Sequence, residues 1–233
     1  MFGKSAMPLT RRAFALSLAA YSASAGVPVV ALGRPALAPP IGRYHYTVLR
    51  QGDKIGTHIR NVSRQSATLV VETDIELAVK FFGITAYRYR HQSVERWRSN
   101  TLIDLESRTR KNGTRKRLHG ERDGSGVLLL ENHKGERRRF PESPLTTTLW
   151  HPETPHVGQL LEVEDGWMKT NAASYLGTET VQAGDRELSA RHYRLDAEVE
   201  RDVWYDARGL LLRVAFEHDD GSRIVMQPAE TFV

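Results

Sequence analysis

The sequence predicts a mainly β protein: a single antiparallel meander that forms a strongly curved sheet or an incompletely closed barrel, with at most one short helix. Three observations support this prediction. Polar and apolar residues alternate over long stretches, turn signals recur between those stretches, and helical periodicity is almost absent. Strands twist and large flat sheets are unusual, so we expect a sheet of ten or more strands to curl.

The clearest strand covers residues 69–81, "LVVETDIELAVKF", in which apolar and acidic residues occupy opposite faces. The next strand, residues 86–97, alternates in the same way, with tyrosines on one face and arginines on the other. Gly83 lies between them and predicts a hairpin turn. That turn places Glu76 opposite Arg90 on the outer face, where an opposite-charge pair contributes about 0.2–1 kcal/mol. Cross-strand pairing therefore explains the basic run without a ligand.

Turn signals follow at short intervals along the rest of the chain. They are "QGDK" at 51–54, "KNGT" at 111–114, "RDGSG" at 122–126, "HKGE" at 133–136, "AGDR" at 183–186, "DARG" at 206–209 and "DDGS" at 219–222. Asn-Gly and Asp-Gly between alternating runs are the strongest short signals for a β-hairpin. The spacing predicts a meander in which each strand pairs with the next.

The chain closes with three predicted strands, at residues 201–206, 210–218 and 222–227. Alternation in the middle strand places four apolar residues on one face: Leu210, Leu212, Val214 and Phe216. We expect this face to point toward the core.

One segment breaks the alternation, and it is also rich in proline. Residues 140–158 contain four prolines, which exclude a central strand. Ser143 as N-cap and Pro144 at the first helical position predict one short helix that ends at Trp150. We expect this crossover to divide two parts of the sheet or to cross one mouth of the barrel, within a single β-rich domain at residues 39–233.

The N-terminus predicts export. Arg11 and Arg12 precede an apolar run at residues 13–20, and the first acidic residue is Asp53. A basic start, a short apolar stretch and small residues beyond it are typical of a secretory signal, and the paired arginines resemble the twin-arginine type. We therefore interpret residues 1–38 as a twin-arginine-type signal peptide and linker, which predicts a periplasmic or secreted protein that meets the twin-arginine translocase during export.

Two features of the signal leave alternatives open. Ala36-Leu37-Ala38 offers a second cleavage point, although Pro39 directly after it is unfavourable. The stretch 13–32 nearly reaches the roughly 20 residues of a membrane span and could be retained as an anchor. Pro28 and Gly26 weaken the anchor interpretation, and we expect the mature domain not to span the membrane.

Charge and cysteine content limit the class of partner. Removing residues 1–38 leaves 29 of the 33 basic residues against 28 acidic ones, because four basic and no acidic residues are lost. The basic excess remains in residues 39–140 and is reversed in residues 141–233. We expect no nucleic-acid partner, since an exported chain seldom meets one. The chain has no cysteine, so its core must hold it together without disulfides.

The segment "WHPETPH", residues 150–156, has the highest density of side chains that could bind a metal ion or take part in catalysis. His151, Glu153 and His156 could surround a metal ion, since imidazole and carboxylate suit zinc. Their spacing matches no zinc motif, and the prolines prevent the helical face on which such ligands usually converge. We favour a rigid loop with Trp150 inserted into a barrel end, and we expect no metal and no cofactor.

Catalytic patterns are weak. The chain has no cysteine nucleophile and no G-x-S-x-G motif. His91 and Glu95 share the apolar face of one predicted strand and could titrate as a pair, although a structural polar bridge is the more common role. A hydrolase that uses this pair, or the residues from His151 to His156, is the third of three functional hypotheses, and we assign no catalytic residues.

Aromatic residues could line an apolar hollow in the concave face. The candidate ligand-binding residues are Tyr44, Tyr46, Tyr87, Tyr89, Trp97, Trp150, Tyr193, Tyr205 and Phe216. An open curved sheet has to cover its inner face with a helix, a partner or a ligand, and the sequence offers at most one short helix. Ordinary core packing also explains these residues, and for the aromatic residues taken alone it is the interpretation we favour, because every core needs them.

Several stretches carry a family resemblance, among them "YTVLRQGDKIGTHIRNV", "TTTLWHPE" and "VWYDARGLLLRVAFEHDDGSRI". They resemble, over about residues 43–227, a family of exported bacterial proteins known as domain of unknown function number six-one-three-four. The closing hairpin is also similar to periplasmic carriers of the LolA and LolB type, which hold lipoprotein acyl chains in an open barrel. This second likeness concerns the fold and does not settle function.

These observations lead to a ranked expectation. The first hypothesis is an exported, non-catalytic periplasmic protein that binds a lipid, a lipoprotein acyl chain or another apolar ligand in the concave face of its sheet. The second is a structural or interaction module of the envelope that binds no ligand.

Overall fold

Thirteen strands join into one antiparallel sheet in the computed structural model, which describes residues 38–81 and 84–232. The strands of this sheet are β1 (Gly42–Arg50), β2 (Asp53–Gln65), β3 (Thr68–Phe81), β4 (Ile84–Arg98), β5 (Thr101–Lys111), β6 (Thr114–Arg122), β7 (Leu128–Asn132), β8 (Arg137–Phe140), β11 (Ala172–Ala183), β12 (Arg186–Asp196), β13 (Arg201–Asp206), β14 (Leu211–Glu217) and β15 (Arg223–Pro228). The predicted mainly β meander is confirmed. The predicted signal peptide lies outside the described residues, apart from Ala38.

The strand order contains one seam. From β1 to β8 and from β11 to β15, each strand pairs with the next along the chain. The two halves are joined where β15 pairs with β1, for example at Pro228 opposite Tyr46. Strands β8 and β11 form the two edges and do not pair with each other, so the sheet is not closed into a barrel.

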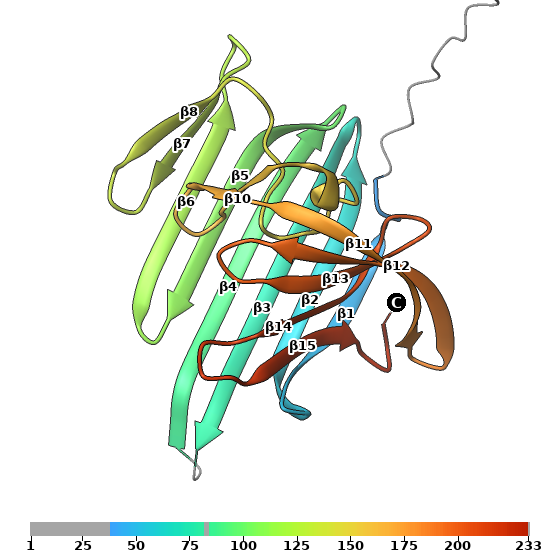
Figure 1. Ribbon diagram of the computed structural model, residues 1–233. Coiled ribbons are helices and arrows are strands. Elements are labelled where there is room, and N and C mark those ends of the chain that lie inside the picture. The colour runs from blue at the N-terminus through green and yellow to red at the C-terminus, as the bar shows by residue number, and fades with distance from the viewer. Residues whose placement is uncertain (1–37, 82–83, 233) are drawn as a thin grey trace, which may run out of the picture. The chain divides into compact units, whose positions relative to one another are not determined.

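The sheet curls so that its C-terminal strands face its central strands. Figure 1 shows β2 to β6 as a long wall, with β12 to β15 crossing in front of it. Two buried tyrosine hydroxyls hold the curled layers: Tyr46 donates to the carbonyl of Leu211 at 2.6 Å, and Tyr205 donates to the carbonyl of Leu149 at 2.8 Å. Buried apolar side chains from both layers form one core cluster.

The predicted turns fall at the junctions between consecutive strands. At the junction of β5 and β6, Asn112 and Gly113 have φ values of 48° and 91°, the left-handed conformation that a type I′ hairpin requires. The strand register also places Glu76 opposite Arg90, as expected from the outer-face pattern.

A β-bulge changes the predicted inner face of β14. Trp204 pairs with Arg213 while Tyr205 pairs with Leu211, which leaves Leu212 as the extra residue. Leu211 therefore lines the same cavity as Val214 and Phe216, instead of facing away from them as simple alternation predicts. Leu210 and Leu212 are buried in the core, as expected, but do not line this cavity with Val214 and Phe216, because the bulge interrupts the alternation.

The crossover segment, residues 141–158, lies across the inner face. It leads into a small hairpin of β9 (Gln159–Leu161) and β10 (Met168–Thr170). The predicted helix from Ser143 to Trp150 does not form. Instead Thr147 donates its backbone N–H to Leu161, whose own N–H bonds back to Leu145.

Competing bonds explain why this helix is absent. The hydroxyl of Ser143 accepts a bond from the backbone of Leu102, 2.7 Å away, so it cannot act as an N-cap. Leu149 has a φ of 59°, which a right-handed helix does not allow. Among the described residues no α-helix occurs, and the one helical turn is a three-residue 3₁₀ turn, η1, at Thr154–His156.

Candidate functional site

A cavity of about 680 Å³ lies between the inner face of the central strands and the C-terminal strands. Its size falls within the range of about 300–1,000 Å³ that is typical of small-molecule sites. Apolar side chains from β3, β14 and β15, which we call the apolar wall, line it from both layers: Ile75, Leu77, Val214, Phe216, Ile224 and Met226. The crossover segment contributes Thr147 to Leu149 to the same cavity.

Another part of the lining, which we call the polar flank, is charged, and several of its charges form ion pairs. Lys116 lies 2.7 Å from a carboxylate oxygen of Asp165 and 3.3 Å from one of Glu164. Tyr89 donates its hydroxyl to Glu164 at 2.9 Å. Burial raises the pKa of Glu162, and the neighbouring Glu164 carboxylate adds to this increase. The cavity therefore has an apolar wall and a polar flank, an arrangement that suits an amphiphilic ligand.

The nine aromatic residues predicted to line a hollow are divided between two places. Tyr87, Tyr89 and Phe216 line the cavity. The other six are buried in the core and do not line it: Tyr44, Tyr46, Trp97, Trp150, Tyr193 and Tyr205. The aliphatic residues of the wall were not distinguishable from ordinary core residues in the sequence.

Two of the six core aromatics form hydrogen bonds to Glu95, whose side chain is completely buried. Trp97 and Trp150 donate their indole N–H groups to Glu95 at 3.1 and 2.9 Å. Thr146 and Thr148 donate their hydroxyls at 3.0 and 2.6 Å. Three of these four donors belong to the crossover, so Glu95 anchors that segment to the sheet.

Burial and hydrogen bonding act on Glu95 in opposite directions. Burial disfavours the carboxylate and raises its pKa, while the bonds from Thr148, Trp150, Thr146 and Trp97 lower it. The effect of burial is larger, so the pKa lies above its usual value. A group enclosed by four protein donors has no free position for a substrate, which makes Glu95 a structural anchor.

The proposed pair of His91 and Glu95 does not form. His91 is bonded through Nδ1 to the hydroxyl of Thr109, 2.8 Å away, and makes no ion pair with Glu95. Burial lowers the pKa of His91 and favours its neutral form. These two residues share a strand face, but four residues along a strand span about 13 Å, which is too far for a hydrogen bond or an ion pair.

The histidines of "WHPETPH" also have separate roles. His151 is buried; its Nδ1 accepts the backbone N–H of Glu153 at 3.1 Å, and its Nε2 lies 2.8 Å from Oδ1 of Asn100. Burial lowers its pKa to about 4. His156 is exposed and contacts the ring of Tyr193 edge to face. Within residues 38–81 and 84–232, no three histidine or carboxylate side chains are grouped so that they could hold one metal ion.

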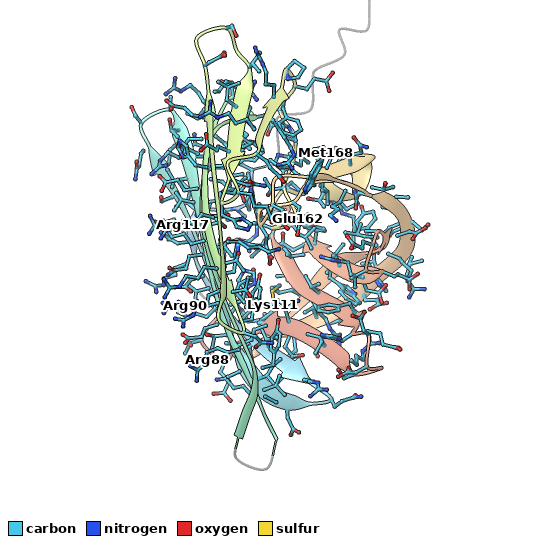
Figure 2. The ribbon with its side chains drawn as sticks, turned by 90° about the vertical axis from the view of Figure 1, so that its left-hand side faces the viewer. Arg88, Arg90, Lys111, Arg117, Glu162 and Met168 are labelled. Atoms are coloured by element: carbon cyan, nitrogen blue, oxygen red, sulfur yellow. The ribbon has the colours of Figure 1, made fainter. Side chains whose placement is uncertain are left out.

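The outer face of the sheet is basic. Seven exposed arginines on β4, β5 and β6 have no carboxylate within 4.0 Å among the described residues: Arg88, Arg90, Arg98, Arg108, Arg110, Arg115 and Arg117. Figure 2 shows Arg88, Arg90 and Arg117 on the outer side, with Glu162 on the inner side. The register places Arg110 between Arg90 and Arg115. Glu76 is opposite Arg90 in register but makes no ion pair with it within 4.0 Å, and the arginines of β5 and β6 face one another, Arg108 opposite Arg117 and Arg110 opposite Arg115.

Arg60 is a buried residue that the sequence pattern did not reveal. Its side chain is 1% exposed and lies on the inner face of β2, where alternation would more readily place Ile59. Arg60 lies two residues from Val62, so the two side chains point to the same face of β2. The sequence could have revealed this, but β2 has too few apolar residues to show which of its faces is buried. Nη2 of Arg60 donates to the carbonyl of Thr148 at 2.7 Å.

In the described part of the chain, no helix is both long and apolar enough to cross a membrane. None of the curated proteins compared with the chain matches it. Among solved structures, the fold is similar to a beta-barrel-like protein of domain of unknown function DUF1849 from Brucella abortus, with a TM-score of 0.56 and 7% sequence identity. The match covers 79% of this chain and 93% of that one, and at this identity it supports the fold alone. Residues 46–229 match the domain of unknown function DUF6134, and the chain therefore belongs to this family.

Proposed function

We propose that the protein is an exported, non-catalytic periplasmic binding protein that holds a lipid, a lipoprotein acyl chain or another apolar ligand between the layers of its curled sheet. The observation that carries this proposal is the cavity of about 680 Å³ with an apolar wall on β3, β14 and β15. Apolar surface that faces a cavity gains about 25 cal/mol per Å² when a ligand removes it from water.

Two further observations support the proposal. No α-helix in the described part of the chain fills the hollow of the sheet. The closing hairpin resembles that of the LolA and LolB type carriers, whose open barrels hold acyl chains. The paired Arg11 and Arg12 support export through the twin-arginine translocase, and export in turn makes a nucleic-acid partner implausible despite the basic outer face.

The test begins with native mass spectrometry of protein purified from the periplasm, in which we expect a co-purified apolar molecule. Binding of the neutral fluorescent probe N-phenyl-1-naphthylamine is then measured for two variants. Ile75→Trp fills the cavity and should abolish probe fluorescence. Ile59→Trp adds the same bulk to the neighbouring strand on the opposite face of the sheet and should retain it.

Absence of both a bound molecule and probe binding would exclude the proposal and favour the envelope module without a ligand. Equal binding by both tryptophan variants would place the probe outside the cavity, which would also contradict the proposal.

A further inference from the structure

The buried polar atoms that lack a partner are concentrated in one place. Among the described residues, eight buried side-chain nitrogen or oxygen atoms make no hydrogen bond. Five of these eight belong to four residues, which we call the Arg60 patch: Arg60, Thr73, His91 and Ser93. The unpaired atoms are Nε and Nη1 of Arg60, Oγ1 of Thr73, Nε2 of His91 and Oγ of Ser93. Buried polar groups are normally bonded, so such a concentration calls for a physical cause.

The four residues are neighbours on three adjacent strands. Arg60 on β2 pairs in register with Thr73 on β3, and Thr73 pairs with Ser93 on β4. His91 lies two residues before Ser93 on the same face of β4. The patch is therefore one continuous polar area on the inner face of the sheet.

The patch contains one positive charge without a counter-charge. The guanidinium of Arg60 makes no ion pair within 4.0 Å in the described part of the chain. Besides the bond to Thr148, its Nη2 lies 3.3 Å from Nε2 of His58, whose pKa is lowered by burial and by Arg60 itself. Burying an unpaired charge costs several kcal/mol, unless a partner that is present in the working state offsets it.

The patch adjoins the apolar cavity. Thr73 and His91 line the cavity together with His58 and Thr148, which both contact Arg60. Ile75 on β3 pairs in register with His58 on β2 and with His91 on β4, and the apolar wall begins at Ile75. A ligand that entered the cavity with an anionic group leading would meet Thr73 and the neutral imidazole of His91 at one end, where the cation of Arg60 lies directly behind the lining residues His58 and Thr148. Its hydrocarbon chain would lie along the apolar wall.

We propose that the Arg60 patch holds the carboxylate of a fatty acid whose hydrocarbon chain occupies the cavity. This inference rests on the proposed function and names its ligand class. A carboxylate carries one charge and only accepts hydrogen bonds, which matches one cation with free donors. A phosphate monoester would bring a second negative charge, and two of the three lysines that line the cavity are already paired, Lys116 with Asp165 and Lys169 with Glu198.

The test compares dodecanoic acid with dodecan-1-ol by displacement of N-phenyl-1-naphthylamine from the purified protein. The wild type should bind the acid at least about tenfold more tightly than the alcohol, since removing one partner of a charged hydrogen bond costs about 1.5–3 kcal/mol. Arg60→Met should reduce this preference to less than about threefold while alcohol binding is retained, and Arg60→Lys should be intermediate. Dodecyl phosphate should bind more weakly than the acid.

Arg213→Met is the matched control. Arg213 also has an unpaired buried Nε, but it stacks on Trp204, which does not line the cavity, whereas Arg60 contacts two lining residues, His58 and Thr148. This variant should keep the full preference for the acid. The unfolding midpoint of ligand-free Arg60→Met should not fall below that of the wild type. This measurement shows whether a lost preference for the acid reflects a lost contact or a lost fold.

Equal binding of acid and alcohol by the wild type, or an unchanged preference in Arg60→Met, would overturn the assignment of the patch and leave the proposed function intact. Failure of both compounds and of the neutral probe to bind would instead overturn the proposed function itself.

Discussion

Glu95 and Arg60 are both completely buried charged residues on the inner face of the same sheet, but their surroundings differ. Glu95 accepts bonds from four side chains, whereas Arg60 keeps two donors without a partner. Thr148 contacts both, since its hydroxyl donates to Glu95 and its carbonyl accepts from Arg60. The two side chains are therefore equally buried, but Glu95 is fully hydrogen-bonded and Arg60 is not. We infer that the fully bonded Glu95 stabilises the fold, and that a ligand supplies the missing hydrogen-bond partners of Arg60.

The largest effect should come from removing the anchor carboxylate. Glu95→Ala leaves two indole N–H groups and two hydroxyls without their acceptor in the core, and we expect the free energy of unfolding to fall by about 3–5 kcal/mol. Urea denaturation followed by circular dichroism measures this change. Glu106→Ala on the outer face is the control, since its carboxylate is 48% exposed and 3.6 Å from Arg96, and it should cost less than about 1 kcal/mol. Similar losses in the two variants would remove the distinction drawn for Glu95.

The second prediction concerns pH and His151, a buried group with both ring nitrogens bonded. Its pKa of about 4 in the folded chain lies below the ordinary value of 6.5, so the unfolded chain binds its proton first. Stability should be complete above pH 6.5 and fall by up to about 3 kcal/mol as the pH decreases to 4. His58 and His91 act in the same direction, because burial lowers the pKa of each.

The raised pKa of Glu95 acts in the opposite direction, since its folded form binds a proton more readily than the unfolded chain. The measurement is therefore a difference between variants. The stability of His151→Gln should depend less steeply on pH than that of the wild type, and His156→Gln, at an exposed position, serves as the control. Parallel pH profiles for His151→Gln and the wild type would contradict the prediction.

A smaller loss is expected when one donor to Glu95 is removed. Trp150→Phe keeps the ring but deletes the indole N–H that bonds to Glu95, and should cost about 1–3 kcal/mol because the carboxylate stays buried. Trp204→Phe deletes an equivalent bond to Glu179, whose side chain is 50% exposed and can bond to water instead. Thermal unfolding of both variants should show the larger decrease for Trp150→Phe, and the reverse order would argue against the anchor.

The smallest effect should come from the Arg60 patch. Thr73→Val removes a hydroxyl that has no partner, so the ligand-free protein should remain within about 0.5 kcal/mol of the wild type or become more stable. Thr146→Val removes a hydroxyl that donates to Glu95 and should lose about 1 kcal/mol or more. Equal losses in the two variants would show that the hydroxyl of Thr73 has a partner in solution.

Local patterns predicted most of the fold. Alternation and glycine-containing turns identified the long strands and the meander, because a strand with one buried face repeats every two residues. The helix predicted from Ser143 to Trp150 was wrong because its caps are decided by distant groups, such as the backbone of Leu102. The pairing of β15 with β1 has no local signal in either strand.

The candidate site was harder to predict from the sequence, because contacts between distant parts of the chain also determine which residues line it. Tyr87, Tyr89 and Phe216 were identified because aromatic residues stand out, but the aliphatic wall is made of residue types that every core contains. His91 and Glu95 share a face without contact, since four residues along a strand span about 13 Å, and each bonds instead to another strand or to the crossover. Arg60 would normally be assigned to the solvent side of a strand, and tertiary structure reverses that assignment.

The seam between β1 and β15 has a consequence for how the chain matures. Tyr46 and Pro228 are opposite each other although they belong to the first and last strands. During synthesis β1 therefore keeps one hydrogen-bonding edge open until the final hairpin has left the ribosome. Joining such distant segments is slow compared with forming the local hairpins. The last step of folding should be the insertion of the C-terminal strand beside the first, so a chain truncated before residue 223 would expose an aggregation-prone edge in the middle of its sheet.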